Sequence, residues 1–142
     1  MSRIEPGKYI IYNRVQDEYG QRLALTFNGD KQVVTVTKLE PNDTKQHWEV
    51  VDRSDGGLQH IKPIDNMTLE AGWDGDYINT VHAGGQCWSI SKNKGWAIQS
   101  GELNMYWSVD RAANRASIKA VGDVLGPQQR WIFVPVGHRI PE

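Results

Sequence analysis

The sequence predicts an all-β fold made of three copies of a four-strand unit, and three observations support this prediction. Gln-x-Trp occurs as Gln46-His47-Trp48, Gln86-Cys87-Trp88 and Gln129-Arg130-Trp131, and a period of about 40 residues indicates one repeated supersecondary unit. Short runs of β-branched and aromatic residues alternate with glycine-containing turns, which is typical of a sandwich or barrel. No long segment shows helical periodicity, since the best candidate, 109–116, is short and interrupted by polar residues.

Each repeat contains four segments suited to short β-strands. In the first repeat, 7–52, these segments are 8–13, 23–26, 33–36 and 48–51. In the second repeat, 57–91, they are 58–63, 69–73, 77–81 and 88–90. In the third repeat, 94–136, they are 95–99, 106–109, 117–120 and 131–134.

Turn signals separate the segments. Asn28-Gly29-Asp30 and Asp74-Gly75-Asp76 supply the positive φ that tight hairpins need, and further signals lie at 17–20, 55–57, 93–95 and 100–101. Twelve short strands in three sets of four describe a β-trefoil, in which six strands close a barrel and three hairpins cap one end around a pseudo-threefold axis. With 142 residues, the chain is expected to form this single domain over 1–142.

The Gln-x-Trp phrases have a structural role in such a fold. Each tryptophan is expected to anchor the last strand of its repeat in the core, and each glutamine can satisfy backbone groups where the chain enters that strand. Trp48 and Trp131 are interpreted as core residues only, because every repeat needs one. The middle phrase is expected to contribute both to the core and to a site.

Composition and charge exclude several classes of function. The net charge is −1 and no basic run occurs, which argues against nucleic-acid binding. No segment has the roughly 18 apolar residues of a membrane span, and the first residues do not resemble a signal peptide, so we expect no membrane insertion and a cytoplasmic location. Cys87 is the single cysteine, so no disulfide can form within the chain.

Catalytic and metal-binding patterns are poor. The four histidines are scattered without metal-ligand spacing, and the serines lack the context of an activated nucleophile. We therefore expect neither an enzyme, nor a metal site, nor a cofactor.

Function in a repeated scaffold is expected where the repeats differ, and Trp73 marks the clearest difference. The first repeat has Leu25-Thr26 where the second has Trp73, a Gly-flanked aromatic followed by polar residues. Aromatic rings stack on the apolar face of a sugar while amides and carboxylates bind its hydroxyls. Two adjacent glycines, Gly84-Gly85, either let a ligand approach the backbone or form a plain flexible turn. The candidate carbohydrate-binding residues are Trp73, Asp74, Asp76, Tyr77, Val81, Gln86, Cys87 and Trp88.

The chain resembles the β-trefoil proteins of mushroom fruiting bodies. The resemblance covers nearly the whole chain and is strongest in the opening segment 8–15 with 21–26, and in Val34-Thr35-Val36-Thr37, Gly72-Trp73 and Tyr106-Trp107-Ser108-Val109. One branch of this group implies a lectin that binds fucosylated chitobiose and acts in defence against nematodes and insects. Its sugar platform would correspond to Trp73 and to Val81, Gln86, Cys87 and Trp88. Gln86-Cys87 stands where the group has an aromatic–apolar pair, so a related GlcNAc-containing sugar is the broader expectation.

The other branch implies an inhibitor of serine proteases. A cospin-like inhibitory loop would correspond to 27–32, with Asn28, Gly29 and Asp30 beside Lys31 as the basic residue offered to trypsin. A cnispin-like loop would fall at about 121–128, which contains neither Lys nor Arg. The expected partners are therefore glycans or glycoproteins or, alternatively, a serine protease. A homodimer is a further expectation, because one weak sugar site gains potency through multivalency.

Overall fold

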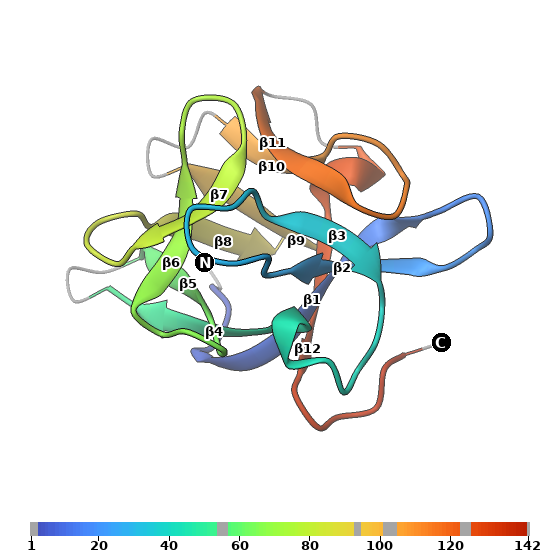
Figure 1. The fold of residues 1–142 in the computed structure, drawn as a ribbon, viewed down its shortest axis with the longest axis horizontal. Helices are drawn as coiled ribbons and strands as arrows, with labels where there is room; N and C mark the ends of the chain where they lie inside the picture. The colour runs from blue at the N-terminus through green and yellow to red at the C-terminus, as the bar shows by residue number, and fades with distance from the viewer. Residues whose placement is uncertain (1–2, 54–56, 93–94, 101–104, 123–125, 142) are drawn as a thin grey trace.

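The computed structural model describes residues 3–53, 57–92, 95–100, 105–122 and 126–141, and in them it shows twelve strands and two short 3₁₀ turns (Figure 1). The expected turn residues Asp55, Gly56, Asn93, Lys94 and Gly101, and residues 123–125 of the cnispin-like segment, lie outside the described residues. The segment 109–116 runs from the last residue of one strand through bends and turns to the first residue of the next, and it forms no helix.

Six strands form a closed barrel. They are β1 (Gly7–Gln16), β4 (His47–Asp52), β5 (Gln59–Pro63), β8 (Trp88–Lys92), β9 (Trp96–Ser100) and β12 (Trp131–Pro135). Each pairs antiparallel with the next in this order, and β12 pairs with β1 to close the ring. Closure leaves no barrel edge unpaired, which suits strands as short as these.

The remaining strands form three hairpins at one end of the barrel. They are β2 (Arg22–Thr26) with β3 (Thr35–Lys38), β6 (Leu69–Trp73) with β7 (Ile78–His82), and β10 (Met105–Val109) with β11 (Ala116–Gly122). Bridges from Val33 to Asn79, Tyr77 to Lys119 and Ala116 to Val36 join the hairpins in a triangle. This is the arrangement of a β-trefoil.

The third strand begins two residues later than the sequence predicts. Thr35–Lys38 forms the strand, whereas Val33 bridges Asn79 and the Val34 N–H donates to the Ile78 carbonyl at 2.8 Å. Val33 and Val34 have strand-like side chains, but their backbone is used to join the first repeat to the second.

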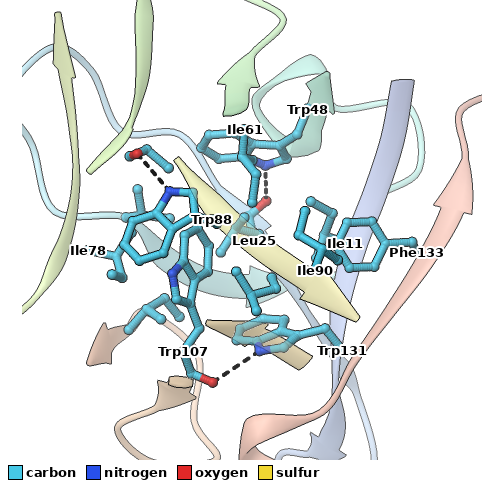
Figure 2. Close-up of a cluster of buried hydrophobic side chains, with 14 of the residues drawn as sticks. Ile11, Leu25, Trp48, Ile61, Ile78, Trp88, Ile90, Trp107, Trp131 and Phe133 are labelled. Carbon is cyan, nitrogen blue, oxygen red and sulfur yellow. Dashed lines mark hydrogen bonds between the residues drawn. The ribbon is translucent and has the colours of Figure 1, made fainter. Parts of the chain in front are cut away.

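Buried aromatic and aliphatic side chains from all three repeats fill the barrel (Figure 2). Trp48, Trp88, Trp107 and Trp131 are each at most 2% exposed. Trp107 packs edge-to-face between Trp88 and Trp131, at centroid distances of 5.0 and 6.4 Å. Edge-to-face pairs of this kind stabilise by about 0.5–1.5 kcal/mol beyond their area burial.

Candidate functional site

The three Gln-x-Trp tryptophans make the same bond in every repeat. The indole N–H of Trp48 donates to the Leu25 carbonyl at 2.9 Å, that of Trp88 to Ala71 at 3.0 Å, and that of Trp131 to Trp107 at 3.2 Å. Figure 2 shows these bonds as dashed lines inside the core. Each bond ties the last strand of a repeat to its hairpin, so the tryptophans are structural anchors, as their spacing predicts.

The glutamines do not follow the symmetry. Gln46 and Gln129 are buried and bond to groups near the entry of their strands, the Glu40 N–H at 2.8 Å and the Gly126 N–H at 2.6 Å. Gln86 is exposed, and its side-chain oxygen lies 3.4 Å from the Trp73 N–H. The expectation that each glutamine satisfies the strand entry therefore holds for the first and third repeats, whereas the second directs Gln86 outward.

A pocket of about 350 Å³ opens beside Gln86. The second repeat supplies most of its wall, and the ends of β4 and β9 complete it. Its lining residues are Arg53, Leu58, Trp73, Gly85, Gln86, Cys87, Trp88 and Ser100. Four of the residues predicted from the sequence, Trp73, Gln86, Cys87 and Trp88, thus meet at one pocket. A volume of this size lies at the lower end of the range for small-molecule sites.

Trp73 and Trp88 contribute differently to this pocket. Trp73 is half-buried at the end of β6, and it packs against the core cluster while lining the pocket. Its indole N–H is buried and has no hydrogen-bond partner among the described residues. Trp88 is 2% exposed, so it is mainly a core residue at the pocket's base. Trp73 is therefore the aromatic side chain that a ligand could stack on.

Gly72 makes room for the polar side of the pocket. A Cβ at this position would lie 2.8 Å from Val81 Cγ2 and 3.0 Å from Gln86 Cγ. Val81, on the partner strand β7, and Gln86 therefore pack directly over the glycine backbone. Val81 thus lies beside Gly72 and is not itself a lining residue of the pocket.

Asp74, Asp76 and Tyr77 lie in the β6–β7 turn and do not line the pocket. Asp74 Oδ1 accepts the N–H groups of Asp76 and Tyr77, both at 2.9 Å, and Oδ2 accepts from Asn79 Nδ2 at 3.1 Å. The N–H groups of Tyr77 and Asp76 lower the pKa of Asp74. The Asp74 carboxylate therefore stabilises the turn.

Tyr77 faces the third repeat. Its backbone bridges Lys119, whose ammonium lies 5.4 Å from the centre of the Tyr77 ring. Asp74, Asp76 and Tyr77 thus lie on the β6–β7 hairpin, as the sequence predicts, but none of the three lines the pocket beside Trp73.

Membership of a known family follows from the match of residues 7–131 to the family described as CCL2 lectin-like. The chain belongs to the CCL2 lectin-like family. It is accordingly a non-enzymatic, carbohydrate-binding β-trefoil protein. None of the curated proteins compared with this CCL2 lectin-like chain matches its sequence.

Solved structures confirm the β-trefoil fold. A mosquitocidal holotoxin matches 92% of this CCL2 lectin-like chain at 16% identity with a TM-score of 0.79, and the chain spans 17% of that toxin's length. The Rhizoctonia solani agglutinin matches with a TM-score of 0.76 at 16% identity, over 95% of this chain and 99% of the agglutinin. A ricin B-like lectin of Macrolepiota procera, solved with lactose, matches with a TM-score of 0.72 at 14% identity, over 94% of this chain and 99% of that lectin. At such identities the likeness concerns the fold alone.

The loop that would inhibit a protease is bound to the neighbouring hairpin of this CCL2 lectin-like protein. The Lys31 N–H donates to the Thr80 carbonyl at 2.9 Å, and the Thr80 N–H donates to Gln32 at 3.0 Å. Lys31 has a left-handed φ of 61°, and Gly29 also has a positive φ. A peptide recognised by strand addition is extended. The backbone at Lys31 is therefore left-handed and hydrogen-bonded to the second repeat, and it is not an extended segment.

Four residues near the pocket were not predicted from the sequence. Arg53 and Ser100, at the ends of β4 and β9, reach the second repeat only through barrel closure, whereas Leu58 lies just before β5 in that repeat. Glu70 is a buried carboxylate at the position held by Ala24 and Tyr106 in the other repeats. A repeat alignment that asked where a charge replaces an uncharged residue would have found Glu70.

Groups that could hold a metal are absent from the part of the chain that the structure describes, where no cluster of three His, Cys, Asp or Glu side chains occurs. Within the same part, no helix is long and apolar enough to cross a membrane.

Proposed function

We propose that this lectin binds a GlcNAc-containing or fucosylated glycan in the pocket of the second repeat, with Trp73 as the stacking platform. The observation that carries this proposal is the convergence of Trp73, Gln86 and the Gly85 backbone on one pocket. An aromatic face beside an amide matches the alternation of apolar faces and hydroxyl groups on a pyranose ring. The resemblance to fungal lectins of fucosylated chitobiose supports the choice of sugar.

The lining of the pocket also supplies polar groups that would specify the sugar. The Gln86 amide offers one acceptor and two donors. Arg53 donates to Cys87 Sγ at 3.0 Å, so a cationic side chain also lines the pocket. Asp74 is engaged in its turn, so the proposal assigns the hydroxyl contacts to Gln86 and to backbone groups in place of Asp74 and Asp76.

A single stacked ring with a few hydrogen bonds supports only weak affinity, with a Kd of roughly mM to μM. Biological potency would then come from multivalency, so we propose a homodimer or the crowding of several lectin molecules on one glycoprotein. We further propose that the protein acts in defence against animals that feed on the producing cell, and that it is stored in the cytoplasm. Loss of toxicity to feeding nematodes in a Trp73→Ala variant tests the defence role, and cell fractionation tests the storage in the cytoplasm.

A glycan array followed by titration calorimetry tests the binding proposal. The array should select GlcNAc-containing or fucosylated glycans, and Trp73→Ala should reduce affinity for the best of them by at least about tenfold, equivalent to about 1.4 kcal/mol. Tyr19→Ala is a matched control, because Tyr19 is an aromatic residue that is 78% exposed and lies outside this pocket. Wild-type affinity in Trp73→Ala, or loss of binding in Tyr19→Ala, would overturn the assignment of the site.

A further inference from the structure

The second repeat enters its last strand differently from the other two. In the first and third repeats, a 3₁₀ turn, η1 (Thr44–Gln46) or η2 (Pro127–Gln129), leads into the strand and ends at the buried glutamine. In the second repeat, residues 83–87 form bends and irregular backbone before β8. Gln86 leaves the position that its counterparts fill, so another group must satisfy the backbone there.

Glu70 supplies that group. Its side chain is 1% exposed on β6, one residue before Ala71, whose carbonyl accepts the Trp88 indole N–H. One carboxylate oxygen, Oε2, accepts three consecutive backbone N–H groups: Gly84 at 3.2 Å, Gly85 at 3.1 Å and Gln86 at 2.7 Å. Successive N–H groups that converge in this way form a concave anion-binding site. Here the anion is the protein's own side chain.

His60 closes the other side of this arrangement. Both groups near its Nδ1 are acceptors, the Gln86 carbonyl at 2.8 Å and Glu70 Oε1 at 3.1 Å, so Nδ1 carries the hydrogen. Oε1 is buried, and none of the described residues gives it an aligned hydrogen bond. Burying a carboxylate is costly unless it is paired and hydrogen-bonded. The three loop N–H groups are therefore the main compensation for placing Glu70 in the interior.

The position of the loop decides what reaches the pocket. Because the Gln86 N–H is held by Glu70 and its carbonyl by His60, the backbone of Gln86 is fixed on both sides. Its side chain is then free to cross Gly72 toward the Trp73 N–H. Gly85 and Cys87, on either side of Gln86, line the pocket, whereas Glu70 does not.

We propose that Glu70 is a positioning residue for carbohydrate recognition, and that its carboxylate sets the conformation of residues 84–87 and so presents Gln86 to the ligand. This inference rests on the proposed function of the pocket. In the second repeat, two different residues then carry the structural role and the binding role, unlike in the other repeats. A carboxylate satisfies the strand entry, which frees the glutamine of the Gln-x-Trp phrase for binding.

Two substitutions and one control test the proposal. Glu70→Gln keeps the shape and one acceptor oxygen but removes the charge, and Glu70→Ala removes the acceptor. Gln129→Ala is the matched control, because it removes a buried polar group from the equivalent strand entry of the third repeat, outside the pocket. The measurements are the thermal midpoint, hydrogen exchange of the Gly84, Gly85 and Gln86 amides, and the rate at which iodoacetamide alkylates Cys87. Affinity is measured for N,N′-diacetylchitobiose and for its fucosylated form.

The proposal predicts a loss of binding that exceeds the loss of stability. In Glu70→Ala, hydrogen exchange at the three amides should accelerate and affinity should fall, each by at least about tenfold, and the rate of Cys87 alkylation should differ from that of the wild type. Glu70→Gln should show the same changes to a smaller extent, because charged acceptors bond more strongly than neutral ones. Gln129→Ala should lower the thermal midpoint and keep wild-type affinity. If Glu70→Ala does not fold, the amide exchange and affinity of Glu70→Gln decide the question.

Wild-type exchange at residues 84–86 and wild-type affinity in folded Glu70 variants would overturn the positioning role. An equal loss of affinity in Gln129→Ala would also overturn it, because the effect would then be one of general stability. Failure of the wild-type protein to bind either sugar would instead count against the proposed function. The exchange and alkylation data would still report whether Glu70 sets the loop.

Discussion

The absence of a Cβ atom at Gly72 shapes the candidate site. Its φ does not lie in the left-handed region, so the backbone does not require glycine there; the space occupied by Val81 and Gln86 does. Gly72→Ala should displace the Gln86 side chain, weaken glycan binding and destabilise the fold by about 1–3 kcal/mol, the usual cost of overpacking. Chemical denaturation and calorimetry measure the two effects.

Gly122→Ala provides the control for that substitution. Gly122 lies in β11, and a Cβ added there would meet nothing within 4 Å. The control should leave both stability and affinity close to those of the wild type. If Gly72→Ala behaved like Gly122→Ala, the packing of Gln86 over Gly72 would have no role in the site.

Asp74 should affect stability and leave sugar binding unchanged. Its pKa is lowered in the folded state, so the folded protein binds this proton less tightly than the unfolded chain. The stabilisation is therefore complete above the ordinary value of about 4 and is lost as the pH falls through the lower folded pKa. The difference in thermal midpoint between wild type and Asp74→Asn should be constant near neutral pH and should shrink below about pH 4. Reduced glycan affinity in Asp74→Asn would contradict this prediction and would indicate that the carboxylate takes part in binding.

Among the elements, the loop between β2 and β3 bears on the choice between a lectin and a protease inhibitor, the two activities that the sequence left open. Lys31 is the one basic residue between Phe27 and Gln32, yet its N–H is bonded to Thr80 and its φ is 61°. We expect no nanomolar inhibition of trypsin, and no difference between wild type and Lys31→Ala in a chromogenic substrate assay. Nanomolar inhibition that disappears in Lys31→Ala would show that the loop rearranges to serve as an inhibitor.

Elements were more predictable than the contacts between them. The twelve strands and the hairpin turns at 28–30 and 74–76 follow from local composition, because side-chain alternation and Gly-containing turns act over a few residues. The shift of the third strand to Thr35–Lys38 depends on a bond from Val34 to Ile78 in another repeat. Arg53 and Ser100 reach the pocket only through barrel closure. Such long-range pairings leave no periodic pattern in the sequence.

The pattern of repeats predicted four residues that line the candidate pocket but not the polar groups that shape it. Trp73 lines the pocket. The acceptors of the indole bonds align Ala71 with Leu25, which pairs Trp73 with Phe27, so the prediction that Trp73 has no aromatic counterpart in the first repeat is wrong. The exchange of roles between Gln86 and Glu70 is hidden, because Gln86 retains its place in the Gln-x-Trp phrase. Sequence spacing reports which residues are equivalent, whereas burial and hydrogen bonding decide which of them face the solvent.

In the whole molecule, a symmetric core supports one asymmetric pocket. Trp131 is fully buried in the third repeat, and its indole bonds to Trp107. Trp131→Ala should destabilise the protein by about 3–5 kcal/mol, as is usual for a buried tryptophan. At a temperature where the variant remains folded, its glycan affinity should equal that of the wild type, which calorimetry at low temperature measures. A large loss of affinity in the folded variant would show that the core and the pocket are coupled.

An NMR titration of the ¹⁵N-labelled protein with fucosylated N,N′-diacetylchitobiose tests the central claim most directly. We expect the largest shifts at the Trp73 indole N–H and at the amides of Gly85, Gln86 and Cys87, all of which belong to the pocket of the second repeat. Shifts that cluster elsewhere, for example at the smaller pocket between Tyr19 and Ala113, would contradict the assignment of the site. An unchanged spectrum at millimolar sugar would contradict the assignment of the ligand.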